Sequence, residues 1–230
     1  MSNVSAIIVC AGNSTRMGGV NKILLPLGER LVIGVTMQAF QACESVKEIV
    51  IVARESDIDA IKAEAEAAGI TKLAQCTTGG NTRQESVING IKKISKDSEF
   101  VAVHDGARPL VKPEHIEKAI KDASVFGGAT LGVPVKDTIK NVDDGIITDT
   151  PPRKFLYITQ TPQVFKRNLY FEGIDFALEH GLDFTDDCQL VEAIGGKVAM
   201  TTGDYSNIKI TTPEDIAIAE VLLRQAKGDN

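Results

Sequence analysis

The chain has no tryptophan and only four cysteines in its 230 residues, and it lacks any Cys-x-x-Cys pair. A structural zinc site draws on such closely spaced pairs, and a small disulfide-bonded domain needs a much denser set of cysteines. The cysteines are scattered instead, at Cys10, Cys43, Cys76 and Cys188. We predict that they are reduced thiols, as is usual in the cytoplasm.

Long hydrophobic runs are also missing. The longest uninterrupted apolar stretch, residues 6–11, has six residues, whereas a helix needs roughly 18 or more to cross a bilayer. The chain starts with Met-Ser-Asn-Val, which carries no basic side chain and leads directly into a strand-like segment, unlike a signal peptide. The sequence therefore predicts no membrane partner and a cytoplasmic location.

The chain has no excess of positive charge. Lys and Arg total 25 against 31 Asp and Glu, which gives a formal net charge of −6. A protein that wraps nucleic acid usually shows the opposite balance, so we expect no nucleic-acid partner. Small anionic substrates remain compatible, because a few local cations can set the field inside a cleft.

What the sequence does contain is an alternation of short β-branched runs and stretches with helical periodicity. Continuous apolar runs, typical of strands buried on both faces, lie at residues 6–10, 48–52, 100–103 and 130–133. Helical patterns lie between them, and this order predicts an α/β fold with a mostly parallel sheet. Because no linker rich in Pro, Gly or Ser divides residues 1–230, we expect a single domain.

Two helix starts are marked by capping residues. Asn81 is followed three residues later by Gln84, which resembles a capping box. Thr212 precedes a proline and two acidic residues, the expected order of a cap and a first helical turn.

One segment departs from the alternation. Residues 134–157 contain two runs in which apolar and polar residues alternate, separated by Asp144-Gly145. This pattern indicates a β-hairpin at a place where the strand–helix alternation predicts a helix. Only about half of each run is apolar, so the hairpin has little core of its own and needs another surface to pack on.

A glycine-rich loop follows the first predicted strand, from Ala11 to Lys22. At the end of a buried parallel strand, such a loop lets backbone N–H groups approach phosphate oxygens. Arg16 and Lys22 add two cations with no acidic residue between them. A flexible strand–helix connection is the alternative, because the loop matches neither GxGxxG nor the P-loop pattern.

Two further turns combine glycine with charge. After Gly79-Gly80, Arg83 and Ser86 lie on one face near the positive end of a predicted helix. Asp105 and Arg108 follow a predicted strand, where open α/β sheets bind ligands. The alternatives are a solvated Arg83 and a purely structural Asp105–Arg108 ion pair.

Two late segments carry the remaining candidates. Thr185 precedes Asp186 and Asp187, and at least one of these acids is expected to do no more than favour a helix start. Lys209 stands between two isoleucines, and its alternative is a solvated lysine on the opposite face of a strand.

Seven segments follow one another between residue 6 and about residue 222: AGNSTRMG followed by Lys22, GGNTRQESVINGI, VHDGARP, VPVKDTIK, QTPQVF, TDD and NIKITTPED. One alone would be a weak signal, but the ordered set is highly specific. Together they resemble the 2-C-methyl-D-erythritol 4-phosphate cytidylyltransferase family of the non-mevalonate isoprenoid pathway. The chain departs from the family pattern at residues 9–11, Val-Cys-Ala where Pro-Ala-Ala is usual, and at Ile23-Leu24, where Gln and an aromatic residue are usual.

The resemblance implies a Rossmann-like nucleotidyltransferase fold with a projecting β-arm, at about residues 134–157, that mediates a homodimer. It also implies a reaction in which CTP and 2-C-methyl-D-erythritol 4-phosphate, with Mg²⁺ as cofactor, give 4-diphosphocytidyl-2-C-methyl-D-erythritol and pyrophosphate. A phosphate monoester, with a second pKa of about 6, is mostly dianionic at neutral pH. It can therefore attack the CTP α-phosphorus in line without a general base.

Carried over position by position, the resemblance implies the site residues. The catalytic cations fall on Arg16, Lys22, Arg153 and Lys209. The nucleotide-binding positions fall on Ala11, Gly12, Asn13, Ser14, Gly18, Gly80, Arg83 and Ser86. The substrate-binding positions fall on Asp105, Arg108, Thr138, Arg153 and Thr185. Asp105 either contacts Mg²⁺, which the CTP phosphates would mainly hold, or bonds a substrate hydroxyl.

Two other functions stay open. A ribitol 5-phosphate cytidylyltransferase would share the chemistry, but the usual Ala-Gly-Gly-x-Gly-x-Arg-Met-Gly and Asp-Ala-Val-Arg-Pro patterns of that family match less well. A nucleotide-binding module without turnover is the second alternative. The presence of Arg16, Lys22, Arg153 and Lys209 speaks against it, because binding alone would tolerate the loss of some of these cations.

Overall fold

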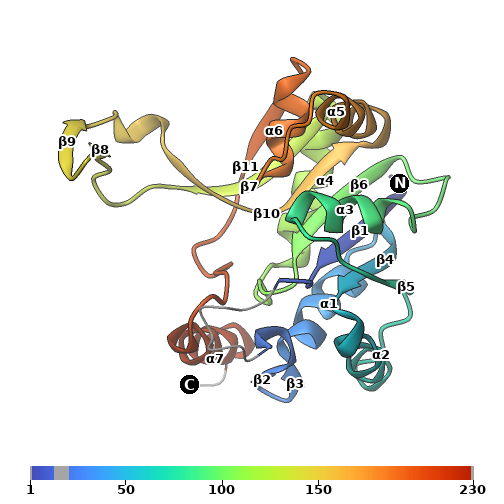
Figure 1. Ribbon diagram of the computed structural model, residues 1–230. Helices are drawn as coiled ribbons and strands as arrows, with labels where there is room; N and C mark the ends of the chain where they lie inside the picture. The colour runs from blue at the N-terminus through green and yellow to red at the C-terminus, as the bar shows by residue number, and fades with distance from the viewer. Residues whose placement is uncertain (1, 13–20, 229–230) are drawn as a thin grey trace.

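A seven-stranded sheet forms the centre of the computed structural model, which describes residues 2–12 and 21–228 (Figure 1). The strand order is β11-β7-β10-β6-β1-β4-β5, and every neighbouring pair is parallel except the two that β10 makes with β6 and β7. The strands are β1 (Val4–Val9), β4 (Val46–Ala53), β5 (Leu73–Thr78), β6 (Phe100–Asp105), β7 (Gly128–Pro134), β10 (Tyr157–Lys166) and β11 (Val198–Thr202). The predicted α/β class with a mostly parallel sheet is confirmed.

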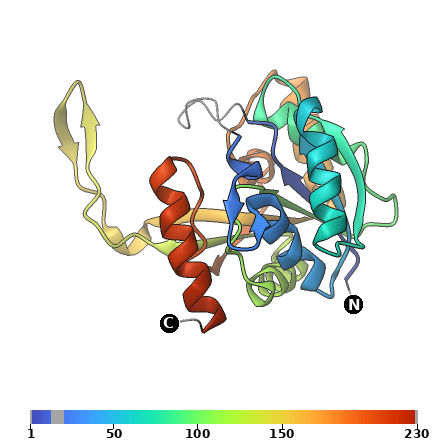
Figure 2. The same ribbon diagram turned by 90° about the horizontal axis from the view of Figure 1, so that it is seen from below.

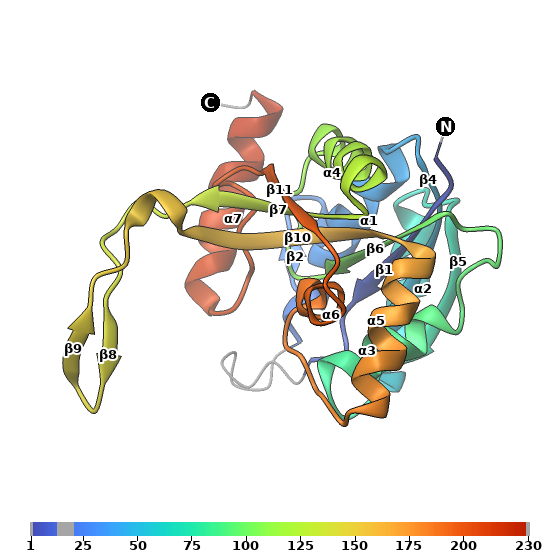
Figure 3. The same cartoon turned by 90° about the horizontal axis from the view of Figure 1, so that it is seen from above.

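Helices cover both faces of this sheet, as the view in Figure 3 shows. On one face are α1 (Val32–Ala42), α2 (Ile58–Ala67) and α4 (Pro113–Phe126); on the other are α3 (Arg83–Ile91), α5 (Arg167–Glu179) and α6 (Asp187–Ala193). Successive residues of a strand point to opposite faces, so Ile8 joins the first core cluster and Ile7 the second. This explains why the central strands are apolar at nearly every position.

The last helix, α7 (Pro213–Lys227), lies near a small two-stranded element made of β2 (Pro26–Leu27) and β3 (Arg30–Leu31). Its predicted start is confirmed, because the Asp215 carboxylate accepts the N–H group of Thr212 at 2.8 Å. The predicted cap of α3 is wrong by one residue. Thr82, not Asn81, is the N-cap, and its hydroxyl accepts the N–H group of Glu85 at 3.1 Å.

The segment at residues 134–157 projects away from the sheet (Figures 1 and 2). Its tip is a hairpin of β8 (Asn141–Asp143) and β9 (Ile146–Asp149), joined by Asp144 and Gly145, both with positive φ, as the predicted turn requires. The return path contains a short 3₁₀ helix, Arg153–Phe155. Large apolar side chains are exposed along this arm: Ile139, Val142, Ile146, Ile147, Phe155, Tyr157 and Ile158. An arm with this surface and no described core needs a covering surface, as the sequence predicts.

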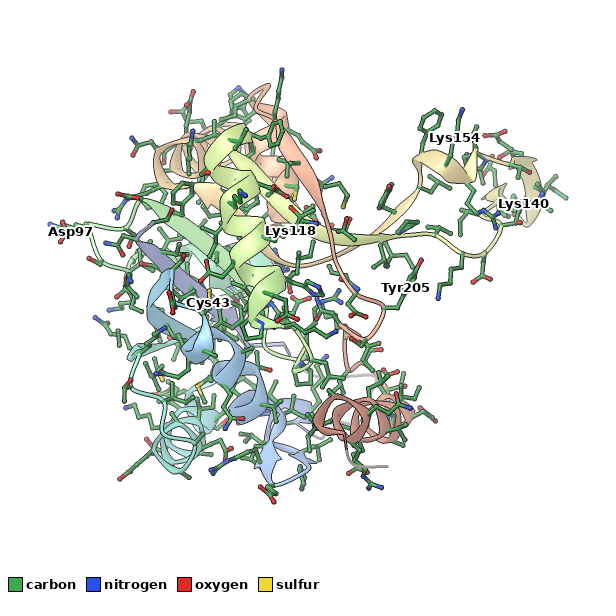
Figure 4. All side chains as sticks on the ribbon, turned by 180° about the vertical axis from the view of Figure 1, so that it is seen from behind. Cys43, Asp97, Lys118, Lys140, Lys154 and Tyr205 are labelled. Carbon is green, nitrogen blue, oxygen red and sulfur yellow. The ribbon has the colours of Figure 1, made fainter. Side chains whose placement is uncertain are left out.

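A loop at residues 203–210 touches the base of the arm. Gly203 donates its N–H group to the carbonyl of Gly132 at 2.8 Å, and the Tyr205 hydroxyl donates to the carbonyl of Pro134 at 2.7 Å. The ammonium group of Lys136 lies 3.6 Å from the centroid of the Tyr205 ring. Figure 4 shows Tyr205 beside the arm's base. The loop thus ties the start of the arm to the body.

One prediction about organisation is not decided by this architecture. The division of the chain into one domain, 1–230, with an arm at about 134–157 stays a prediction. Among the described residues, none of the helices is long and apolar enough to cross a bilayer.

Close packing of α3 on the sheet gives a first test. A Cβ added at Gly90 would lie 2.6 Å from Ile7 Cγ2 and 2.8 Å from Val52 Cγ2, and neither short β-branched side chain can turn aside. Gly90→Ala is therefore expected to lower the free energy of unfolding by about 1–3 kcal/mol, despite its better helix propensity. Urea denaturation measures this, with the exposed Lys121→Ala on α4 as the control. An unchanged or more stable Gly90→Ala protein would contradict the packing.

Candidate active site

A pocket of about 330 Å³ opens at the carboxyl ends of the parallel strands β1 and β6, where α/β sheets bind ligands. Predicted site residues from five separate places in the chain line it: Ala11, Gly12, Lys22, Gly80, Arg83, Ser86, Asp105 and Lys209. Asn13, Ser14, Arg16 and Gly18 lie outside the described residues. The structure therefore brings the described part of the glycine-rich loop, the start of α3, the β6 turn and the Lys209 loop together.

The start of α3 fits closely against the glycine-rich loop. A Cβ at Gly79 would lie only 2.3 Å from the Cβ of Ala11, so this turn needs a residue without a side chain. The Ser86 hydroxyl accepts the N–H group of Gly80 at 3.0 Å and donates to the carbonyl of Thr82 at 2.9 Å. These bonds fix the backbone that faces the pocket.

Arg83 is a partly buried cation with a buried partner. Its Nη2 lies 2.5 Å from Oδ2 of Asp187, and its side chain is 27% exposed. Burial works against the charged guanidinium, but the Asp187 carboxylate outweighs this effect and raises the pKa of Arg83 above its usual value. The alternative of a solvated surface arginine does not fit these contacts.

Asp105 is the buried anion at the centre of the site. Its Oδ2 lies 3.0 Å from Nζ of Lys209 and 3.2 Å from Nε of Arg108. Burial alone would raise the pKa of this carboxyl, but Lys209, Arg108 and Arg83 outweigh it, so the pKa is well below its usual value. Asp105 is therefore ionised at neutral pH, and Lys209, in a loop rather than the expected strand, turns toward it.

Arg108 fits its structural alternative. Its side chain is only 12% exposed, and its Nη1 donates to the carbonyl of Asn207 at 2.9 Å. It does not line the pocket. Arg108 thus braces the β6 turn against the loop that carries Lys209, and its predicted contact with substrate stays a prediction.

The neutral side chain of His104 fixes the turn that follows β6, through hydrogen bonds outside the pocket. The backbone N–H of Asp105 donates to the Thr161 hydroxyl at 3.0 Å, and that hydroxyl lies 3.0 Å from Nδ1 of His104. Nε2 of His104 lies 3.1 Å from the carbonyl of Arg108, which can only accept. This assigns the proton to Nε2 and makes Thr161 the donor to Nδ1. Burial lowers the pKa of His104 to about 4.

Sequence reasoning did not single out Thr161 or Asp187. Thr161 lies in the QTPQVF segment, which carries no charge, and the sequence predicts only that at least one of Asp186 and Asp187 favours a helix start. Asp186 is the residue with that role, because it caps α6 and accepts the N–H group of Cys188 at 2.8 Å.

Besides Arg108, three predicted residues are not brought to the pocket of their own chain. Thr138 and Arg153 are exposed on the arm, and Arg153 Nη1 donates to the carbonyl of Lys136 at 2.6 Å. Thr185 lines a separate depression together with Thr130 and Thr159. The roles of Thr138, Arg153 and Thr185 stay predictions.

The mostly parallel sheet, the glycine turns at its carboxyl edge and the cations around one carboxylate define the class of protein as a Rossmann-like nucleotidyltransferase. Comparison with known proteins identifies the family. Residues 4–225 match the family model of 2-C-methyl-D-erythritol 4-phosphate cytidylyltransferase. The chain belongs to this family and is an enzyme of the cytidylyltransferase type.

Individual relatives agree over the whole chain. The 2-C-methyl-D-erythritol 4-phosphate cytidylyltransferase of Caldanaerobacter subterraneus is 47% identical, covering 97% of this chain and 100% of the relative. That of Clostridioides difficile is 41% identical, covering 98% and 95%. The crystal structure of 4-diphosphocytidyl-2C-methyl-D-erythritol synthase from Anaerococcus prevotii superposes with a TM-score of 0.86 at 33% identity, covering 97% of this chain and 96% of that one.

The buried His104 generates a prediction about pH. Its pKa is about 4 in the folded chain against 6.5 for an ordinary histidine, so between these values the unfolded chain binds more protons. The free energy of unfolding must then fall as the pH falls from 6.5 toward 4, by up to about 3 kcal/mol from this group. The Asp105 carboxyl affects the free energy of unfolding only at lower pH, below its ordinary pKa of 3.8.

Urea denaturation between about pH 7 and pH 5 measures this slope. His104→Gln, whose amide can still donate to the Arg108 carbonyl, is expected to show a flatter dependence than the wild type. Asn168→Gln, an exposed change on α5 that removes no titratable group, should keep the wild-type slope. Equal slopes in all three proteins would show that His104 is not the group that binds the proton.

Proposed function

We propose that this chain transfers a cytidylyl group from CTP to 2-C-methyl-D-erythritol 4-phosphate, giving 4-diphosphocytidyl-2-C-methyl-D-erythritol and pyrophosphate. The observation that carries the proposal is a single pocket in which Lys22, the Asp105–Lys209 pair and the start of α3 converge. Membership of the family supports the substrates. The seven family segments quoted from the sequence favour this polyol over ribitol 5-phosphate.

The chemistry needs charge neutralisation and alignment. A phosphate oxygen of the substrate attacks the α-phosphorus of CTP, a new P–O bond forms, and the bond to the β-phosphate oxygen breaks, with its electron pair leaving on pyrophosphate. Two anions must approach each other, so Lys22 and Lys209, both lining the pocket, would reduce the repulsion and hold the groups in line. We assign no general base, since the nucleophile is already ionised.

Mg²⁺ is the proposed cofactor. The described residues hold no cluster of three or more His, Cys, Asp or Glu side chains, which would suit a metal held by protein alone. One ionised carboxylate facing a triphosphate suits Mg²⁺, which takes few protein ligands. Arg108 and Lys209 both contact Oδ2 of Asp105, so Oδ1 is the oxygen that would reach the ion. When bound, Mg²⁺ would neutralise charge on the triphosphate.

We further propose a homodimer in which the arm of one subunit completes the site of the other. Support comes from the exposed apolar side chains of the arm, which need a cover, and from the projection of the arm away from the sheet of its own subunit (Figure 1). In a two-fold dimer such an exchange serves both sites equally.

We also propose a cytoplasmic location. None of the four cysteines forms a disulfide bond, which supports this location.

Pyrophosphate release tests the substrate assignment. With CTP and Mg²⁺, the chain is expected to turn over 2-C-methyl-D-erythritol 4-phosphate and to turn over ribitol 5-phosphate at least about 10-fold more slowly, because a site built for one set of hydroxyls leaves polar groups unpaired with another. Equal or faster reaction of ribitol 5-phosphate would replace the assignment with the alternative polyol. No release with either substrate would favour a binding module.

Subunit mixing tests the exchanged arm. Lys22→Ala and Arg153→Ala are each expected to lower kcat by about 10²–10³, since each removes a charge aimed at the reacting phosphates. In a mixed dimer, the Arg153→Ala chain supplies an intact Lys22 and its partner's arm supplies an intact Arg153. One of two sites should recover, to roughly half the wild-type rate per dimer.

Lys154→Ala, the neighbouring arm cation, is the matched control and should keep wild-type turnover. Verified mixed dimers without recovery would place both residues within one subunit. Near-normal turnover of Lys22→Ala itself would make that lysine a surface cation.

A further inference from the structure

We infer that Asp187, with the hydroxyl of Tyr170, is a positioning residue that fixes Arg83 at the nucleotide side of the pocket. The inference rests on the proposed function, because it concerns how the chain binds CTP. Asp187 and Tyr170 do not line the pocket themselves. They act on it only through the guanidinium of Arg83.

The contacts form a buried chain behind the pocket. Oδ2 of Asp187 lies 2.5 Å from Nη2 of Arg83, and Oδ1 accepts the Tyr170 hydroxyl at 2.5 Å. Asp187 is 2% exposed and Tyr170 is fully buried. The backbone N–H of Asp187 donates to Oε1 of Gln163 at 3.0 Å, which fixes the position of the carboxylate. Oδ1 of Asp187 thus accepts a hydrogen bond, whereas Oδ2 has the charged contact with Arg83 and accepts no hydrogen bond of good geometry from the described residues.

Neighbours of Arg83 attach the same helix turn to the same segment of chain. Nε2 of Gln84 donates to the carbonyl of Leu182 at 2.9 Å, and Oε1 of Gln84 accepts the N–H group of Phe184 at 3.0 Å. The Thr82 hydroxyl donates to Asp183 at 3.1 Å. Hydrogen bonds therefore join the first turn of α3, which carries Arg83, to residues 182–187.

Helix capping does not account for Asp187. Asp186 already caps α6 through its bond to the N–H group of Cys188. A carboxylate that only favoured a helix start would be exposed to solvent at little cost, whereas Asp187 is buried against a cation. Removing its charge would take the nearest anion away from the partly buried Arg83 and leave the guanidinium free to turn from its present direction.

The pairing also defines what Arg83 contributes. With Asp187 beside it, the pair has no net charge, so its attraction for a triphosphate is weak. Arg83 still offers N–H groups with a fixed direction, because its guanidinium is planar and is held by Asp187, which lies outside the pocket. Such a group suits an uncharged acceptor on the nucleoside, whereas Lys22 and Lys209, which line the same pocket, are the cations that we propose for the phosphates.

The test measures CTP binding by calorimetry in the presence of Mg²⁺ and without acceptor, on the full chain. Asp187→Asn is expected to weaken CTP binding about 10- to 100-fold and Tyr170→Phe about 3- to 10-fold. The KM for 2-C-methyl-D-erythritol 4-phosphate at saturating CTP should change less than about 3-fold. Asp175→Asn, an exposed acid on α5, is the matched control and should bind CTP as the wild type does.

A double-mutant cycle separates positioning from general destabilisation. In the Arg83→Met background, Asp187→Asn is expected to cause no further loss of CTP affinity, because its effect passes through Arg83. An additive loss, or wild-type CTP affinity in Tyr170→Phe or in a folded Asp187→Asn, would overturn the inference. Tyr170→Phe decides alone if Asp187→Asn does not fold. A wild-type chain that fails to bind CTP would overturn the proposed function instead.

Discussion

The site depends on one buried negative charge, that of Asp105 at the end of β6. A carboxylate that is 9% exposed is stable only if cations compensate it, and two cations meet at its Oδ2. Arg108 comes from the same turn, but Lys209 comes from a loop a hundred residues later. That loop must therefore pass over the sheet edge, and its path is fixed by a bond from Ile210 N–H to the carbonyl of Ala107 at 2.8 Å.

The same loop links the site to the arm. Its first residues bond to β7 and to Pro134, where the arm begins, and its last residues bond to the β6 turn. Between them, the Asn207 side chain donates to the carbonyl of Thr161 at 3.0 Å. The loop that carries Lys209 is thus bonded both to the base of the arm and to the β6 turn. The arm, which we propose forms the dimer, therefore contacts the same loop as the one that carries Lys209, which we propose acts on the phosphates.

Strands β1, β4, β6 and β7 could be predicted because burial on both faces requires a continuous apolar run in each of them. The run at residues 6–10 is apolar throughout, and the structure places β1 there with residues 4–9. The Asp144-Gly145 turn is equally local. Partner choice is different, because nothing near Asp187 in sequence indicates Arg83 or Tyr170. Thr161 likewise meets His104 only because β10 pairs with β6. Such contacts are properties of the assembled fold.

The two paired cations of the pocket differ in what an arriving anion can do with them. Lys209 is 39% exposed on a flexible stem and has a single 3.0 Å contact to Asp105. It can turn to a phosphate, because Arg108 stays on Oδ2 and keeps the carboxylate compensated. Arg83 cannot turn without leaving the almost fully buried Asp187 unpaired. In the proposed reaction, the burial of each partner would therefore separate the two roles: Lys209 would be a movable charge for the reacting phosphates, and Arg83 a fixed donor for the nucleotide.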